Sequence, residues 1–186
     1  KSDRIYRVIR ETRPREGSVR YSAGTSGALA PALRSDFPEV EQTVRITRLW
    51  YWVRYGDQVF QQRLCLADAS ILEVFDLQFI KGDPMTVLRD PYTIVFTEET
   101  ARKYFGDEDP MGRIVTVEGR YIGGDYRITG VVQNMPTKSS LQFDFISSTV
   151  TNYHFWHSWD PESGWRPVET YVLLPEGYAS GKLVAK

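Results

Sequence analysis

The chain has 186 residues, of which 41% are hydrophobic and 25% are charged. This balance is typical of a folded globular domain, and the length is sufficient to bury a core. Lys and Arg together number 23 against 24 for Asp and Glu, so the formal net charge is −1. A nucleic-acid-binding protein or an anionic-membrane binder would show a basic stripe or a polybasic cluster, and neither is present.

The sequence contains no membrane-spanning segment by hydropathy. Its longest apolar run, residues 49–53, is far shorter than the ~20 residues that cross a bilayer. No apolar core of a signal peptide follows Lys1-Ser2-Asp3-Arg4. Cys65, the only cysteine, cannot form an intrachain disulfide, and its neighbours Leu64 and Leu66 favour a buried, unreactive thiol. Taken alone, these features would suit a cytoplasmic protein.

The first forty residues predict a strand, a loop and a helix. Residues 4–12 alternate between apolar and polar side chains, which is typical of a strand, whereas residues 13–26 are rich in Pro, Gly and Ser and indicate a loop. Apolar residues then recur at helical spacing, with Pro31 in the first turn and Pro38 ending the helix. The apolar face of this helix would consist of Leu29, Ala32, Leu33 and Phe37.

A long strand over residues 44–55 follows, and its apolar side chains change faces near residues 47–49, which predicts a bulge. Gly56-Asp57 is typical of a two-residue hairpin turn and leads into a return strand over residues 59–67. We expect Asp68 to cap a short helix with Ile71, Leu72 and Phe75 pointing inward. Gly82-Asp83-Pro84 predicts a turn that starts another helix.

The second half begins with a compact strand–helix–strand–strand pattern after a break at residues 89–91. Ile94 and Phe96 lie on one face of the first strand, Thr97 is a candidate N-cap, and Gly106 is placed to end the helix. Further strands are predicted over residues 114–117, 126–132, 141–145 and 169–174. Because strands and short helices are mixed without strict alternation, we predict an α+β fold with mostly antiparallel pairing.

Candidate metal sites are weak. His154, His157 and Asp160 have a spacing that zinc ligands can use, but aromatic residues surround them, which favours an aromatic-rich surface loop or a junction between lobes. The acidic residues 107–109 do not form an EF-hand loop, because Met111 stands where that loop needs Asp or Asn. We predict a solvated turn there and no bound metal.

Motifs of catalysis are missing from the sequence. It contains no glycine-rich phosphate-binding loop and no nucleophile motif of hydrolases. We therefore predict no catalytic residues, no cofactor and no enzymatic activity. Carboxylates that are distant in sequence can still meet in a catalytic pair, so a hydrolase stays open as a third class of function.

The strongest binding signal is the segment of residues 49–53. Trp and Tyr dominate the energetics of protein interfaces, so two Trp beside a hairpin indicate a contact surface. The alternative is that the whole strand is buried, since a strand that is apolar on both faces is usually covered on both. We favour burial of Leu49, Tyr51 and Val53, and we retain Trp50 and Trp52 as candidate partner contacts.

Residues 68–112 carry a resemblance to a known family. Their sequence, DASILEVFDLQFIKGDP followed by DPYTIVFTEETARKYFGDEDPMG, resembles the periplasmic core domain of MacB-like and FtsX-like permeases of ABC exporters. The same resemblance includes residues 3–8, 29–33, 36–40, 126–131 and 141–145, and FGDEDPMG is its most specific part. It implies a mechanical and binding module without a catalytic centre.

The resemblance also implies an architecture and a location. The fold would have two lobes: a porter-like α/β lobe formed by residues 1–90 and completed by about residues 166–186, and a smaller mixed α/β lobe inserted at residues 91–165. Both chain ends would lie in the porter-like lobe, so the strand at residues 169–174 would pair with the N-terminal strand or its neighbours. The domain would lie in the periplasm, between the first two transmembrane helices of an inner-membrane protein.

The function implied by the resemblance is transmission of ATP-driven motion to a transported substrate or a periplasmic partner. The implied partners are a cytoplasmic ATPase, a second permease subunit, and a periplasmic or outer-membrane protein, while the isolated chain is expected to be monomeric. The transported substrate is not encoded in any motif. The alternative function is a free-standing secreted protein that binds a hydrophobic ligand or peptide, for which the parent gene would encode a cleaved signal peptide and no flanking membrane spans.

Overall fold

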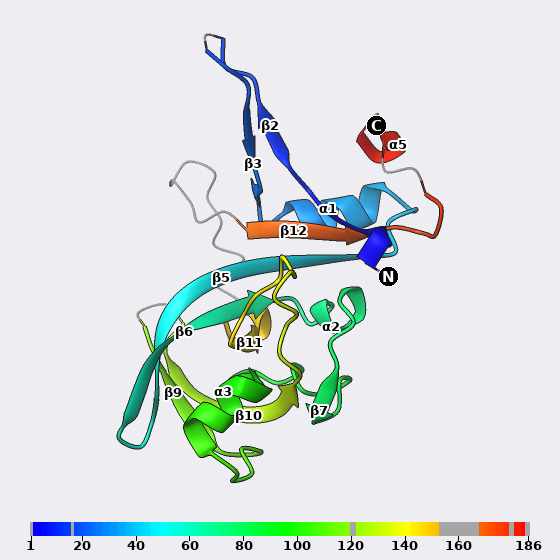
Figure 1. Ribbon diagram of the computed structural model, residues 1–186. Coiled ribbons are helices and arrows are strands. Elements are labelled where there is room, and N and C mark those ends of the chain that lie inside the picture. The colour runs from blue at the N-terminus through cyan, green and yellow to red at the C-terminus, as the bar shows by residue number, and fades with distance from the viewer. Residues whose placement is uncertain (1, 16, 120–121, 153–167, 179–180, 185–186) are drawn as a thin grey trace. The chain divides into compact units, whose positions relative to one another are not determined.

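The computed structural model describes residues 2–15, 17–119, 122–152, 168–178 and 181–184 (Figure 1). It is a mixed α/β fold made mostly of strands with few helices. Contacts divide the chain into two compact units. Unit 1 consists of Lys1–Thr47, Ser70–Asp76 and Trp156–Lys186, and unit 2 consists of Arg48–Ala69 and Leu77–Phe155.

This division differs from the predicted boundaries. Residues 48–69 and 77–90 group with unit 2, whereas the break at residues 89–91 lies within that unit. The chain therefore passes between the units four times, and the first passage lies inside strand β5 (Gln42–Tyr55). The change of apolar face expected near residues 47–49 falls at this same place: Val44 and Ile46 are buried before it and Val53 after it.

Unit 1 is organised around strand β12 near the C-terminus. β12 pairs antiparallel with β1, β4 and the first part of β5; Tyr171, for example, lies opposite Arg7 on one side and Val44 on the other. The predicted pairing of this strand with the N-terminal strand is confirmed. The elements are η1 (Ser2–Arg4), β1 (Ile5–Arg7), β2 (Arg10–Thr12), β3 (Arg20–Ser22), β4 (Gly24–Thr25), α1 (Leu29–Asp36), α2 (Ile71–Val74), β12 (Val168–Leu173) and α5 (Gly181–Val184).

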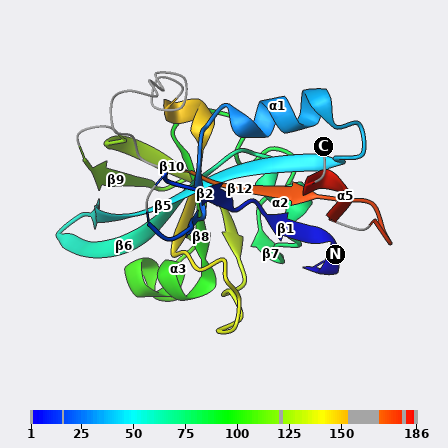
Figure 2. The same cartoon turned by 90° about the horizontal axis from the view of Figure 1, so that it is seen from above.

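Helix α1 lies beside β12 (Figure 2). The predicted helix is confirmed, with Pro31 at its third position, where the missing N–H would have no partner in any case. One predicted core residue is wrong: Ala30 is buried and Ala32 is exposed. The core of this region contains Val40, Val172 and Leu174, with Tyr6, Val8, Leu33, Phe37, Tyr178 and Leu183 packed against them.

The predicted loop over residues 13–26 is wrong in part. β2 and β3 pair with each other as a separate two-stranded sheet, in which Glu11 lies opposite Tyr21, and β4 follows. Almost every residue of β2 and β3 is exposed. Without a buried face the sequence has no apolar alternation, so the usual signal for a strand is missing. The predicted strand over residues 4–12 is correspondingly split into β1 and β2.

Unit 2 is a closed barrel of six strands. Its strands run in the order β5, β6, β11, β8, β10 and β9, and β9 returns to pair with β5. β7 pairs with the C-terminal end of β10, at Val131 and Val132. The elements are β6 (Gln58–Ala67), β7 (Phe79–Lys81), β8 (Thr93–Thr97), α3 (Glu98–Phe105), β9 (Ile114–Glu118), β10 (Gly124–Val132), β11 (Phe145–Ser148) and η2 (Thr149–Asn152).

Antiparallel pairs predominate, as predicted, although β6–β11 and β8–β10 are parallel. The hairpin turn is confirmed: Gly56 has φ +55° and joins β5 to β6 together with Asp57, which fits a turn with positive φ at its first central residue. Figure 2 shows this hairpin beside β9. Because the barrel closes, its strands leave few unpaired edges.

Helix α3 follows the predicted pattern. Thr97 is its N-cap and accepts a hydrogen bond from the Thr100 backbone N–H, and Gly106 ends it with φ +59°. One other local prediction is wrong. Ser70, and not Asp68, precedes α2, and Asp68 instead accepts a hydrogen bond from the Thr149 hydroxyl.

Two more segments depart from regular structure. Gly82-Asp83-Pro84 forms a turn without a helix, in which the Asp83 side chain and carbonyl accept the hydrogen bonds. The strand predicted over residues 141–145 begins only at Phe145, although Leu141 and Phe143 are buried as expected.

Candidate functional site

Trp50 and Trp52 lie on the outer face of the barrel. Trp50 is 61% exposed and Trp52 is 51% exposed, whereas Val53, which follows Trp52 in β5, is fully buried. Leu49 and Tyr51 are partly buried. Successive side chains of a strand point to opposite faces, so the alternation places the two indoles toward solvent. We call the exposed face of Trp50, Trp52, Arg54, Arg63, Ile114 and Glu118 the aromatic surface.

Strand β9 extends this surface on one side of β5. Trp52 lies opposite Glu118, and Arg54 lies opposite Thr116. Arg54 donates two hydrogen bonds to Glu118 Oε1, from Nε at 2.8 Å and from Nη2 at 2.5 Å. Ile114, two positions before Thr116, is 50% exposed. The aromatic surface therefore combines apolar area with an exposed ion pair.

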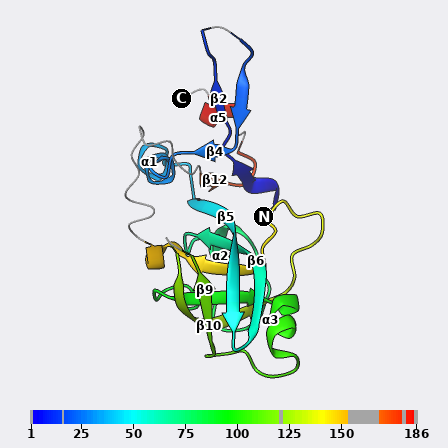
Figure 3. The same ribbon diagram turned by 90° about the vertical axis from the view of Figure 1, so that its left-hand side faces the viewer.

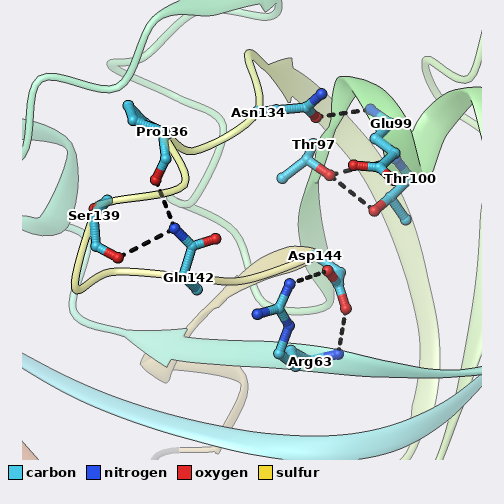
Figure 4. Close-up of polar contacts among 9 residues, drawn as sticks. All are labelled: Arg63, Thr97, Glu99, Thr100, Asn134, Pro136, Ser139, Gln142 and Asp144. Carbon is cyan, nitrogen blue, oxygen red and sulfur yellow. Dashed lines mark hydrogen bonds and ion pairs between the residues drawn. The ribbon is translucent and has the colours of Figure 1, made fainter.

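Strand β6 extends the surface on the other side. The guanidinium carbon of Arg63 lies 5.9 Å from the centre of the Trp50 ring, within the range of a cation–π contact. Asp144 holds this arginine: its carboxylate accepts from Arg63 Nη2 at 3.1 Å and from the Arg63 backbone N–H at 2.7 Å (Figure 4). The buried Gln62, with its amide oriented to satisfy both neighbours, donates to Asp144 and accepts from Lys103.

The segment before Asp144 is fixed at several points. Gln142 Nε2 donates to the carbonyls of Pro136 and Ser139, at 2.7 and 3.1 Å (Figure 4). The Asn134 side chain accepts from the Glu99 backbone N–H in the first turn of α3, and Arg48 donates to the Ser140 carbonyl. Because these contacts reach α3 and β5, residues 133–144 add a polar border that is anchored to the barrel.

The aromatic surface rests on a packed interior. Tyr104 of α3 contacts Phe60, Phe96 and Phe145, with ring centres 5.2, 5.9 and 6.1 Å apart. Its hydroxyl donates a hydrogen bond of 3.0 Å to the carbonyl of Val53, the residue that follows Trp52 in β5. Burial raises the pKa of Tyr104 to about 12. The strand that carries the two Trp is therefore tied to the core by a buried hydrogen bond.

A glycine next to β9 allows β5 to pack closely. At Gly119 an added Cβ would lie 2.4 Å from Cε1 of Tyr51, which is closer than side-chain atoms tolerate. The absence of a side chain at Gly119 leaves room for the Tyr51 ring on the opposite side of β5 from the indoles. Because Tyr51 packs against Gly119 on this side of β5, its neighbours Trp50 and Trp52 point to the other side, which is the aromatic surface.

The other candidates do not assemble into a site in the described part of the chain. His154, His157 and Asp160 lie outside the described residues. The residues that the structure describes contain no cluster of three or more His, Cys, Asp or Glu that could hold a metal ion. Cys65 is buried in β6, as predicted.

The acidic turn of residues 107–109 is held by basic side chains. Lys81 Nζ lies 2.9 Å from Asp109 Oδ1, and Arg113 Nη2 lies 2.5 Å from Glu108 Oε2. The hydrogen bond from Lys81 lowers the pKa of the Asp109 carboxyl. These ion pairs agree with the prediction of a solvated turn.

Sequence reasoning missed four members of the aromatic surface, which are Arg54, Arg63, Ile114 and Glu118, and it also missed Asp144, which holds Arg63. Arg63 and Asp144, and likewise Arg54 and Glu118, are paired across 81 and 64 residues of sequence, so no local pattern reveals them. A weak signal existed for β9: Ile114, Thr116 and Glu118 alternate with the buried Val115 and Val117. That alternation predicts which face is outside but not which strand lies next to it.

Comparisons with known proteins identify the family. A family model of the MacB-like periplasmic core domain matches residues 1–186. No curated protein sequence matches the chain significantly. Among the described residues, no helix is long and apolar enough to cross a membrane.

Solved structures with a similar fold agree with this match. A domain from a permease-like protein of Porphyromonas gingivalis is 26% identical with a TM-score of 0.79, over 97% of this chain and 77% of that one. The periplasmic region of MacB from Actinobacillus actinomycetemcomitans is 16% identical (TM-score 0.65; 87% and 71% covered). The extracellular domain of the noncanonic ABC-type transporter YknZ from Gram-positive bacteria is 17% identical with a TM-score of 0.61, over 88% of this chain and 78% of that one. The chain therefore belongs to the family of MacB-like periplasmic core domains, and it is a periplasmic domain of an ABC-type permease.

Proposed function

We propose that this domain transmits ATP-driven motion of its permease to a periplasmic partner, and that the aromatic surface is the contact. The observation that carries the proposal is the exposure of Trp50 and Trp52 on a closed barrel. Trp side chains bring large contact areas at a low cost in side-chain entropy, and they are enriched among the residues that dominate binding energy. An outward-facing pair of Trp on a rigid strand is suited to that role.

The neighbours of the two indoles support a preformed contact. Arg63 is held over Trp50 by Asp144, and Arg54 is held beside Trp52 by Glu118. Arg enrichment accompanies Trp in binding hot spots, and a guanidinium that is already oriented loses less entropy on binding. A partner that presents apolar side chains with a polar border would complement this surface.

We further propose that unit 1 corresponds to the porter-like lobe and unit 2 to the inserted lobe. In this arrangement both ends of the chain belong to unit 1, so movement of adjoining membrane helices would act on unit 1 and reach unit 2 through the four chain passages. Two arrangements that differ by about a few kcal/mol suffice for a switch. The parent's partners would be a cytoplasmic ATPase and a second permease subunit.

The transmission is tested with spin labels in the full-length permease assembled with its ATPase in nanodiscs. Labels at Arg34→Cys in unit 1 and Met85→Cys in unit 2 report the distance between the units; both side chains are exposed. Buried Cys65 stays in place, and other cysteines of the permease are replaced. We expect trapping with ATP and vanadate to shift the distance distribution. An unchanged distribution would contradict transmission between the units.

The contact is tested separately by photo-crosslinking in cells. A benzoylphenylalanine at position 52 should form an adduct with a periplasmic protein, whereas the same probe at Met85, which is also exposed on unit 2, should not. Replacing Trp50 and Arg63 by Ala should weaken the adduct at position 52. Equal adducts at both positions, or none at position 52, would remove the aromatic surface from the proposal without affecting the spin-label result.

A further inference from the structure

Residues 9–22 form a second exposed feature, which we call the basic ribbon. Its strands are β2 and β3, and Figures 1 and 3 show these strands extending away from α1 and β12 of unit 1. β2 and β3 pair only with each other among the described strands. An isolated two-stranded hairpin is marginally stable in water, so a ribbon of this kind gains stability when a partner covers it.

The charge of the basic ribbon is opposite to that of the rest of the chain. Its sequence contains four Arg and two Glu, a net charge of +2, whereas the other 172 residues carry 19 basic and 22 acidic side chains, a net charge of −3. Arg13 is paired with Glu11. Within the described part of the chain, no carboxylate lies within ion-pair distance of Arg10, Arg15 or Arg20. Three arginines are therefore available to an acidic partner.

The register of the basic ribbon separates its two faces. Arg10 lies opposite Ser22 and Arg20 lies opposite Thr12, whereas Tyr21 lies opposite Glu11. Paired residues share a face of a sheet, so one face presents two arginines between hydroxyl groups and the other presents Tyr21, which is 70% exposed. Ile9 and Val19, both 44% exposed, flank the strands. The ribbon thus offers basic, polar and apolar contacts within a few residues.

The outer edges of β2 and β3 identify the class of partner. Each strand has one neighbour among the described strands, so the backbone groups along its other edge are open to a further strand. Backbone pairing of this kind is supplied by an extended polypeptide and not by lipid, which offers no partners for open strand edges. The three unpaired arginines are also fewer than the four to eight of a typical polybasic membrane site.

We propose that the basic ribbon is a docking arm that binds an extended acidic segment of a partner protein by strand addition. The partner's backbone would pair with an open edge of β2 or β3, and its carboxylates would bind Arg10 and Arg20. The inference is independent of the aromatic surface, because it rests on unit 1 alone. It assigns to this chain a second interaction surface with a different chemistry.

The test uses a synthetic peptide with alternating Glu and Val, and a matched peptide with Lys in place of Glu. We expect only the acidic peptide to bind, with slower amide exchange in β2 and β3 and an affinity that falls as salt rises. The double variant Arg10→Glu/Arg20→Glu should weaken binding at least ten-fold. The control Arg34→Glu makes the charge change of one of these two substitutions on an exposed residue of α1, and it should leave binding unchanged.

Each other outcome would overturn the proposal. Equal binding of both peptides would show that charge plays no part, and absence of binding would remove the docking site. Binding to vesicles of phosphatidylglycerol and phosphatidylcholine, lost in the Arg10→Glu/Arg20→Glu variant, without peptide binding would identify a membrane as the occupant. Concentration-dependent association of the chain in sedimentation, abolished by the same variant, would identify a second copy. Because the ribbon has no core of its own, the variant is expected to unfold at the temperature of the unchanged chain, which circular dichroism verifies.

Discussion

The barrel of unit 2 and the basic ribbon of unit 1 both expose large aromatic side chains, but they support them differently. Trp50 and Trp52 project from a strand whose alternate residues are buried, as Val53 is, or partly buried, as Leu49 and Tyr51 are, and whose edges are closed by neighbours. Tyr21 projects from a two-stranded ribbon with exposed residues on both faces. Exposure of an aromatic residue therefore does not by itself describe a binding surface; the buried support behind it decides whether that surface is already formed.

This difference implies two modes of binding. A partner of the aromatic surface meets side chains that are already held, by Asp144 and Glu118 among others, so little ordering accompanies association. A partner of the basic ribbon must itself order the strands it joins, which reduces the net affinity. The largest effects of substitution on stability should therefore come from the barrel, and the smallest from either exposed surface.

The largest effect is expected for Phe145→Ala in the barrel. Phe145 is fully buried, and its ring centre lies 4.3 Å from that of Phe96. Removing a buried Phe side chain lowers the free energy of unfolding by about 3–5 kcal/mol. In the basic ribbon, Tyr21→Ala should change it by less than about 0.5 kcal/mol. Urea denaturation of the two variants measures both values, and similar values would contradict the contrast between the two regions.

The next effect concerns alkaline pH. Burial raises the pKa of Tyr104 to about 12 from the ordinary value of 10.0. Between these values the unfolded chain releases this proton and the folded chain retains it, so stability is full below pH 10 and falls as the pH rises toward 12. In Tyr104→Phe, which also loses the hydrogen bond to Val53, this part of the pH dependence should vanish. Urea midpoints measured at pH 9 and pH 11.5 should fall less for the variant than for the unchanged chain.

A smaller effect is expected at the N-terminus of α3. Thr97→Ala removes the acceptor for the Thr100 backbone N–H and should lower the free energy of unfolding by about 1 kcal/mol. Thr97→Ser retains the hydroxyl and serves as the matched control. Thermal unfolding of the two variants distinguishes the loss of the cap from the loss of a methyl group, and equal destabilisation by both would assign the effect to packing.

Sequence reasoning was accurate where an element depends on local contacts, and it failed where the element depends on residues distant in the sequence or lacks a buried face. Helix α3 was predictable because its signals are local: Thr97 caps it, Gly106 ends it, and its buried residues are spaced by helical turns. The two-residue turn at Gly56 was predictable for the same reason. The basic ribbon was not, because strands without a buried face carry no apolar alternation.

Closure of the barrel was also beyond the sequence. It depends on β9 meeting β5, with Trp52 opposite Glu118, and no pattern within either strand specifies that neighbour. For the aromatic surface, the alternation of β5 correctly favoured burial of Val53 and separated it from the two Trp. The partners that hold the surface, Arg63 with Asp144 in particular, come together only through the parallel pairing of β6 with β11.

The smallest effect on stability is expected for Trp52→Ala, although this residue is central to the proposed contact. Half of its side chain is exposed, and the Arg54–Glu118 ion pair beside it does not depend on the indole. Its removal should therefore change the free energy of unfolding by less than about 0.5 kcal/mol. The adjacent residue supplies the control, because Val53 is fully buried and Val53→Ala should lower that free energy by about 2 kcal/mol. Urea denaturation compares the two variants directly. If Trp52→Ala destabilised the chain as much as Val53→Ala, the indole would be part of the barrel's packing, and its exposure would no longer favour a role in binding a partner.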